Sequence, residues 1–470
     1  MARGRTGAGT MSRALIRRSG AWSRSQFETG NSANKGLTST LPEHLRLAIS
    51  PQGGIVRGLM NMSSDPGDPR LFLSLATPAN PRLFGQEQYG LIDFFASGMG
   101  FTPEEANTSA VAEAVERYCA AYVIPERTVL AAWNELEGDA LHPDELPLFT
   151  KEQYEQWQFP YRPFTEQSRI RWIQSYSLTT GRTKWVPAAI AWDSYIPQSG
   201  DEESICFGLM TGSAAGSTKE QAMISGLLEI IERDSFMIMW YNSLSLPRLD
   251  ILETPVSEQF KELLDPSKFT LSVVDTTSDI GIPSAFGLLT TRDGKVSVGG
   301  SARLSMEDAV RKTLMEISQL FIGNKAQIYS KTLPSLLPHQ VTDYGLRLPY
   351  YEQPFANEEL AFTVASDEIR GIHEDASIAL APETDRLQYI VDCLSKRGLE
   401  VLCVDVTTDD VRQLGLHVVK MIIPGTVQLP RSEQERLVTS DRIYKTPVEL
   451  GLRSEPIRPE DLNNSPHPFP

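Results

Sequence analysis

A chain of 470 residues, of which 41% are hydrophobic, can bury a large core, and its length alone suggests two or more lobes. Its formal net charge of −16 argues against non-specific binding to nucleic acids or to a membrane surface. The four cysteines form no C-x-x-C pair, and no apolar run reaches the length of a membrane span. These features predict a cytoplasmic protein without a zinc site or a disulfide framework.

The first forty residues are rich in Arg, Ser and Gly, and no acidic residue precedes Glu28. A transit peptide has a similar composition. We favour a disordered basic arm, or an over-extended start with Met11 as the true first residue. From residue 41 to residue 92 the chain shows only short apolar pieces broken by Pro and Gly.

The first predicted helix begins after Thr102, a good N-cap that is followed by Pro103, and runs to about Val123. It contains the run S-A-V-A-E-A-V-E-R. Offsets of four, seven and eight residues place four polar side chains of this run on one face: Ser109, Glu113, Glu116 and Arg117.

A second helix carries the same face in an apolar setting. It follows the small, flexible residues G-S-A-A-G, is capped by Ser217 or Thr218, and runs to about Tyr241. The same offsets align Ser225, Glu229, Glu232 and Arg233. A helix this apolar is normally buried, and unpaired buried carboxylates cost several kcal/mol each. The polar face therefore requires partners.

A third helix, from Ser305 to about Phe321, places Lys312, Glu316 and Gln319 at offsets of four and seven. One such face alone would most simply be solvated, with an intrahelical Glu–Arg pair. Two identical copies and a partial third predict several helices that aim carboxylates into one polar site. A divalent cation can offset that charge, and oxygen-only ligands favour Mg²⁺ or Ca²⁺.

Strands are predicted between and after these helices. Two hairpins are expected, and a helix over 383–397 precedes two further strands. The predicted strands cover residues 169–177, 184–192, 268–274, 282–289, 295–300, 399–406 and 417–423. Helices and hairpins alternate throughout, so we predict an α+β fold with helices packed on mostly antiparallel sheet.

The run G-S-A-A-G-S-T-K imitates a P-loop, but three residues separate its glycines and Lys219 does not follow the second glycine directly. We therefore predict no P-loop there, although the helix N-terminus could favour an anion.

Several motifs in order resemble the YcaO superfamily. They are S-x-x-x-E-x-x-E-R after a G-x-G turn, then A-A-G-S-T-K-E-Q-A, a second E-x-x-E-R-D, and W-Y-N. The resemblance covers about residues 85–430. The chain ends in L-N-N-S-P-H-P-F-P, which is similar to the Pro-x-Pro-x-Pro tail of azoline-forming YcaO cyclodehydratases. The resemblance implies a YcaO-like domain over 41–430, in which residues up to about 84 could form a sub-lobe, and a C-terminal extension over 431–470.

The resemblance also implies ATP and Mg²⁺ as cofactors. It implies that Glu113, Glu116, Glu229, Glu232 and Glu316 hold Mg²⁺, and that Ser109, Arg117, Ser225, Arg233 and Gln319 contact nucleotide. In the tail, Pro466, Pro468 and Pro470 would form a stiff polyproline II segment that positions the terminal carboxylate for catalysis, so deleting the tail should spare ATP binding. One departure is Met99, which stands where the family usually shows a phosphate-binding Lys.

The implied activity is ATP-dependent cyclodehydration of a ribosomally made precursor peptide, of the bacteriocin or thiazole/oxazole-modified type. Backbone amide oxygens would be phosphorylated, and Cys, Ser or Thr would become thiazoline or oxazoline. Implied partners are a leader-binding, activating-enzyme-like protein, a flavin dehydrogenase of the same pathway, and a second copy in a homodimer. Alternatives are a thioamide- or amidine-forming relative, or a non-catalytic docking scaffold in which Arg117 and Arg233 merely neutralise Glu113 and Glu229.

Overall fold

The computed structural model describes residues 38, 41–62, 64–79, 96–193, 195–252, 254–328, 336–342, 344–351, 353, 356–372 and 377–469. The predicted basic arm lies outside these residues apart from Thr38, and so does Pro470. No helix in these ranges combines the length and apolar character needed to cross a bilayer.

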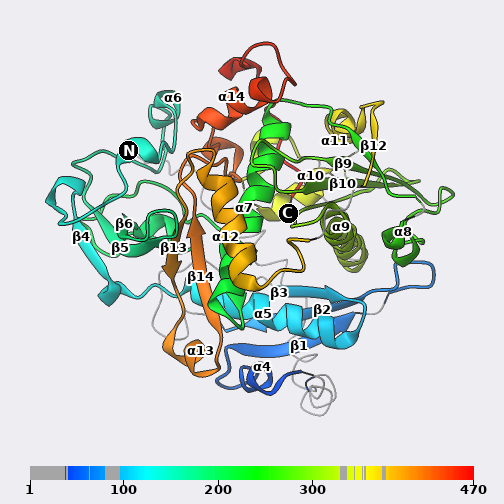
Figure 1. The fold of residues 1–470 in the computed structure, drawn as a ribbon, viewed down its shortest axis with the longest axis horizontal. Coiled ribbons are helices and arrows are strands. Elements are labelled where there is room, and N and C mark those ends of the chain that lie inside the picture. The colour runs from blue at the N-terminus through cyan, green and yellow to red at the C-terminus, as the bar shows by residue number, and fades with distance from the viewer. Residues whose placement is uncertain are drawn as a thin grey trace, which may run out of the picture.

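Three sheets surround the long helix α7 (Lys219–Tyr241), which stands at the centre of Figure 1. Within the described ranges, all strand pairs are antiparallel except β8 with β12. This arrangement confirms the predicted α+β fold. The first sheet contains β1 (Val56–Met62), β2 (Phe72–Pro78) and β3 (Ala96–Gly100). The second contains β8 (Arg248–Asp250), β9 (Phe269–Asp275), β10 (Ser284–Thr291), β11 (Val296–Ala302) and β12 (Ile369–Gly371).

The third sheet contains β4 (Thr128–Ala131), β5 (Ile170–Ser177), β6 (Thr183–Pro187), β7 (Ser213–Gly216), β13 (Leu402–Asp405) and β14 (His417–Ile422). The other long helices are α5 (Pro103–Ala121), α9 (Met306–Ile328) and α12 (Glu383–Ser395). Shorter helices are α4 (Glu43–Leu47), α6 (Lys151–Tyr154), α8 (Pro255–Gln259), α10 (Arg347–Tyr351), α11 (Ala356–Leu360), α13 (Asp409–Gln413) and α14 (Asp441–Glu449).

Each sheet ends in an edge strand that leads directly into a long helix. The pairs are β3 with α5, β7 with α7, and β11 with α9. All three helices begin with the same device, a hydroxyl that accepts a hydrogen bond from a backbone N–H three residues later. The donor–acceptor distances are 3.2 Å at Thr102, 3.0 Å at Thr218 and 3.1 Å at Ser305. The chain thus builds one strand–helix unit three times.

Glycines allow two of these strands to lie very close to their helices. A Cβ added at Gly98 would lie 2.2 Å from the backbone nitrogen of Ala110, and one at Gly299 would lie 2.5 Å from the carbonyl oxygen of Thr313. No side chain fits such a gap, so glycine fixes how closely strand and helix pack.

The apolar surface of α7 is buried along its whole length, as its composition predicts. Leu227 and Ile231 belong to a core cluster shared with α12 and β14. Further along the helix, Phe236 and Trp240 belong to a second cluster that includes Phe469 near the end of the chain. The two clusters hold α7 between the sheets.

The C-terminal extension folds back along α7. The backbone N–H of Asn463 donates to the carbonyl of Tyr241 at 2.9 Å, and the indole of Trp240 donates to the carbonyl of Ser465 at 3.1 Å. Tyr351 donates its hydroxyl to the carbonyl of Pro466. The domain boundaries at about residues 40 and 430 remain predictions.

Several elements differ from their sequence-based predictions. The small residues before α7 are not a flexible turn, because residues 213–216 form the edge strand β7 paired with β14. The predicted strand over 184–192 ends at Pro187, and a 3-10 helix follows over Ala188–Ile190. Both predicted hairpins are confirmed, as β5 with β6 and β10 with β11.

Candidate functional site

The first glutamate of each polar face is held in the same way. One carboxylate oxygen accepts a hydrogen bond from a backbone N–H in, or just before, the edge strand that precedes its helix. Edge strands have backbone groups without a neighbouring strand, and a carboxylate can satisfy them. The distances are 3.0 Å from Ser97 N to Glu113, 3.1 Å from Gly212 N to Glu229, and 3.4 Å from Gly300 N to Glu316.

Electrostatic coupling connects the carboxylates of the three helices. Burial raises the pKa of Glu116 well above its ordinary value, and the charges of Glu229 and Glu113 raise it further. Burial also raises the pKa of Glu232 to about 8; Arg233 opposes the shift, while Glu316 and Glu229 reinforce it. Because such effects need short separations in a partly desolvated setting, these five glutamates form one acidic region.

This acidic region fits a divalent cation. The buried Oε1 of Glu232 has no hydrogen-bond donor among the described residues, and its ionic partner is Arg233 Nε at 3.4 Å. Carboxylate oxygens are the ligands that Mg²⁺ prefers. Among the described residues, no group of three or more His, Cys, Asp or Glu side chains already has the arrangement of a metal site.

The two arginines of the polar faces differ in their partners. Arg117 donates from Nε and Nη2 to the same oxygen of Glu113, at 2.8 and 2.6 Å. Arg117 therefore pairs with Glu113 of the same helix, α5, and neutralises its charge. Arg233 instead lies beside Glu232 and over the ring of Phe469, with Cζ 4.4 Å from the ring centroid.

Gln319 lies on the polar face of α9, as the sequence predicted. Its hydrogen bond joins the strand–helix unit of β11 and α9 to that of β3 and α5. Its amide nitrogen donates to the hydroxyl of Ser97 at 2.5 Å, while Ser97 N donates to Glu113. Ser97 was not predicted as a site residue. The sequence feature that could have indicated Ser97 is its place in S-G-M-G, just before the first polar helix.

A buried ion pair behind α5 and α7 was also missed. Lys420 Nζ lies 2.9 Å from Asp193 Oδ1, which also accepts the hydroxyl of Ser213 at 3.0 Å. The lysine side chain is 1% exposed. The charge of Asp193 raises the pKa of Glu116 and of Glu229, where burial is the largest cause. Since Asp193 and Lys420 are remote in sequence and belong to no motif, spacing offers no signal for this pair.

Met99 belongs to the hydrophobic core and not to the acidic region. It is buried in an apolar cluster with Leu73 and Leu314. Positive charge reaches the acidic region from other positions. The charge of Arg303 partly opposes the rise that burial causes in the pKa of Glu232, and Lys312 Nζ lies 3.4 Å from Glu316 Oε1.

Ser109 and Ser225 are exposed on their helices. Their contact with nucleotide stays a prediction. In the tail, residues 466–469 are buried, and Phe469 brings the chain to Arg233. Pro466 and Pro468 lie on this path, while Pro470 is outside the described residues.

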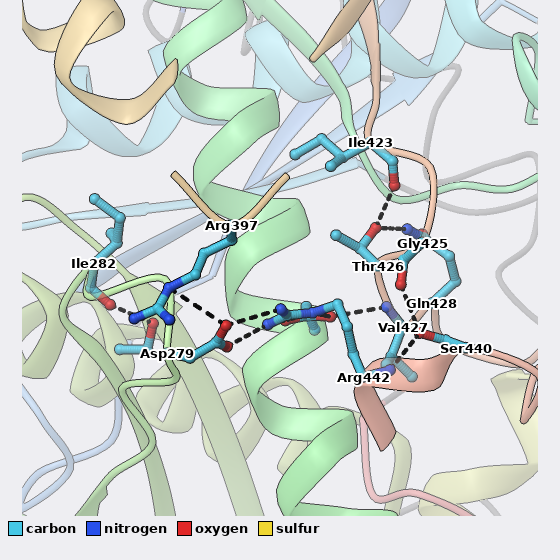
Figure 2. Close-up of polar contacts among 12 residues, drawn as sticks. Asp279, Ile282, Arg397, Ile423, Gly425, Thr426, Val427, Gln428, Ser440 and Arg442 are labelled. Atoms are coloured by element: carbon cyan, nitrogen blue, oxygen red, sulfur yellow. Dashed lines mark hydrogen bonds and ion pairs between the residues drawn. The ribbon is translucent and has the colours of Figure 1, made fainter. Parts of the chain in front are cut away.

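Behind the acidic region, α7 is fixed by the C-terminal extension. Arg442 of α14 donates to Asp234, the residue after Arg233, at 2.6 Å, and to Asp279 at 2.7 Å. Asp234 also accepts the backbone N–H of Val427 at 2.9 Å. Figure 2 shows the guanidinium of Arg442 pointing toward Asp279. One arginine thus joins α7, α14 and the loop before β10.

Comparison with solved structures supports the fold. A "heterocyclase in complex with substrate and cofactor" is 25% identical, with a TM-score of 0.71 over 92% of this chain and 57% of that chain. The heterocyclase TruD is 25% identical, with a TM-score of 0.58 over 78% of this chain and 52% of that chain. The chain therefore spans little more than half the length of these two proteins. YcaO from Methanopyrus kandleri, bound with AMPPCP and Mg²⁺, shares the fold at 20% identity, with a TM-score of 0.57 over 81% of this chain and 88% of that chain.

Comparison with sequences leads to the family. An uncharacterized protein of Methanothermobacter thermautotrophicus is 25% identical over 349 residues, which are 72% of this chain and 82% of that protein. The family model described as YcaO cyclodehydratase, ATP- and Mg²⁺-binding, matches residues 97–427. That range includes all three polar helices, and it confirms ATP and Mg²⁺ as ligands of the family. The chain belongs to the YcaO family.

Proposed function

We propose that this chain is an ATP-dependent cyclodehydratase that converts Cys, Ser or Thr residues of a ribosomally made peptide to thiazoline or oxazoline. The observation that carries the proposal is the acidic region built from three strand–helix units, with the C-terminal tail seated on Arg233 beside it. The heterocyclase neighbours support ring formation in particular.

The carboxylates of Glu113, Glu116, Glu229, Glu232 and Glu316 would hold Mg²⁺, directly or through water. When bound, Mg²⁺ supplies positive charge that offsets the phosphate oxygens and the charge developing during phosphoryl transfer. Arg233, Arg117, Ser109, Ser225 and Gln319 would contact the nucleotide. Of these, Arg233 is best placed to meet a phosphate, since Phe469 and Glu232 hold it at the edge of the acidic region.

The reaction needs no nucleophile from the enzyme. A substrate thiol or hydroxyl adds to the carbon of the preceding amide, and the resulting oxyanion takes the γ-phosphoryl group of ATP. The addition closes the five-membered ring, and loss of phosphate together with the amide N–H proton then forms the C=N bond of the azoline, so the amide oxygen leaves with the phosphate and the peptide loses one water. The carboxylate of Pro470 would position the substrate or accept its proton, with Pro466 and Pro468 stiffening the approach.

The proposal includes a substrate peptide, a leader-binding partner protein, a flavin dehydrogenase that acts later, and a homodimeric assembly. We place the chain in the cytoplasm, which fits its four free thiols. No contact with nucleic acid or membrane is proposed.

The test is the mass of a candidate precursor peptide after incubation with this chain, its leader-binding partner and MgATP. Loss of one water mass per modified Cys, Ser or Thr is the expected result. Exchange of oxygen for sulfur or nitrogen would indicate the thioamide- or amidine-forming alternative. An unchanged mass with nucleotide bound would indicate a scaffold. A variant that ends at Phe469 should bind nucleotide but cyclise poorly, because its carboxylate is displaced by about 3 Å.

A further inference from the structure

The side chain of Phe469 is fixed by its neighbours near the end of the tail. Its ring meets Phe236 of α7 edge-on at 4.5 Å and Phe286 of β10 at 5.9 Å between centroids. On β11, a Cβ added at Gly300 would lie 2.8 Å from the ring, so only a glycine leaves room for it. With 4% of its surface exposed, Phe469 is a core residue that happens to lie in the tail.

The face of this ring carries the guanidinium of Arg233, at 4.4 Å from Cζ to the centroid. Arg233 also approaches Glu232 through Nε, so the ring and the carboxylate hold the guanidinium between them. A planar guanidinium stacks on an aromatic face, and the attraction grows when the pair is shielded from water. The Arg233 side chain is 19% exposed, so this pair is largely shielded.

We propose that Phe469 is a positioning residue for nucleotide binding, acting through Arg233. The ring fixes the guanidinium of Arg233 so that it faces the phosphates, which couples docking of the tail to occupation of the nucleotide site. This inference rests on the proposed function, because it requires that Arg233 contacts a phosphate of the nucleotide. It replaces the expectation that deleting the tail spares ATP binding.

The coupling must act in both directions, because linkage between two binding events is reciprocal. A docked tail orders Arg233 before the nucleotide arrives, so less freedom is lost on binding. A bound nucleotide in turn favours the docked tail. The tail would then contribute to nucleotide binding as well as to cyclisation.

The direct test is Phe469→Leu, which keeps apolar volume but removes the aromatic face. The matched control is Phe286→Leu, the same change in the same aromatic cluster; among the described residues, the ring that Arg233 lies over is that of Phe469 and not that of Phe286. Calorimetric titration of the full chain with Mg²⁺ and a non-hydrolysable ATP analogue, without peptide, measures affinity. We expect about fivefold weaker binding for Phe469→Leu and unchanged binding for the control.

A double variant shows whether the effect passes through the arginine. In an Arg233→Met background, Phe469→Leu should weaken binding no further. Phe469→Trp keeps an aromatic face and should retain more affinity than Phe469→Leu. Wild-type affinity in Phe469→Leu, or an equal additional loss in the Arg233→Met background, would overturn the inference.

A measurement on the wild-type protein tests the same coupling even if the variants fail to fold. Hydrogen exchange at the backbone amides of His467 and Phe469 should become slower when the MgATP analogue is added. Unchanged exchange with analogue bound overturns the coupling. If the wild-type protein binds no nucleotide at all, the proposed function itself fails, and the two failures are thereby distinguished.

Discussion

Among single residues, Glu229 connects the polar faces of α5 and α7. It accepts a backbone hydrogen bond from Gly212, and its charge raises the pKa of both Glu116 and Glu232. Replacing Glu229 by Gln should abolish ATP turnover, because it removes a ligand charge while keeping the shape of the side chain. The rate of phosphate release from ATP measures the turnover. The control is Glu220→Gln in the first turn of the same helix, which should retain turnover; equal turnover in both variants would refute the assignment.

The raised pKa of Glu232 predicts a pH dependence of stability. Without Mg²⁺ or nucleotide, the folded protein keeps a proton on this carboxyl up to about pH 8, whereas the unfolded chain loses it near its ordinary value. Unfolding therefore releases a proton between these values, and the free energy of unfolding falls as pH rises through that range.

Denaturant titrations at about pH 6 and pH 8 measure this dependence. In Glu232→Gln the decline should be smaller, since the side chain no longer ionises. Parallel declines in the variant and the wild-type protein would exclude Glu232 as the cause.

How far sequence predicts a site residue depends on where its partners lie. The offsets of four, seven and eight residues aligned the glutamates correctly, because helix periodicity is a local property. The roles of Ser97, Asp193 and Lys420 could not be predicted in this way. Their contacts join positions that are far apart in the chain, and only folding brings them together.

At the scale of elements, the strand–helix unit explains why the site has three similar parts. An edge strand offers an unpaired N–H, and the following helix places a glutamate to accept it. The sequence predicted the helices and the strand over 295–300. It did not predict β7, because a run of Ser, Ala and Gly has low strand propensity and forms a strand only through pairing with β14.

The link from α14 to α7 should be important for stability. Arg442→Met would leave Asp234 without its buried cation and weaken the pairing of Asp279, which retains Arg397 at 3.6 Å. Breaking such a buried pair costs about 3–5 kcal/mol. Equilibrium unfolding of the variant measures the loss.

The matched control is Arg458→Met in the same extension, where the side chain is 69% exposed and its ion pairs should contribute below about 1 kcal/mol. Similar losses in the two variants would show that the buried link does not stabilise the extension.

At the scale of the whole molecule, the edges of three sheets meet around one acidic region, and the chain returns along α7 to the same place. The overall class could be predicted from alternating helices and hairpins. The path by which the C-terminal extension returns along α7 could not be predicted. Residues 431–462 carry no motif, and their position depends on partners such as Asp234 and Tyr241.

The central claim is that three separate units build one MgATP site, and α9 tests it most directly because its motif is the least complete. Calorimetric titration with Mg²⁺ and a non-hydrolysable ATP analogue should compare Glu316→Gln with Glu307→Gln, a change in the first turn of the same helix, where Glu307 pairs with Arg311. We predict that Glu316→Gln loses Mg²⁺-dependent binding and that Glu307→Gln keeps it. Wild-type binding in Glu316→Gln would contradict a site shared by all three helices.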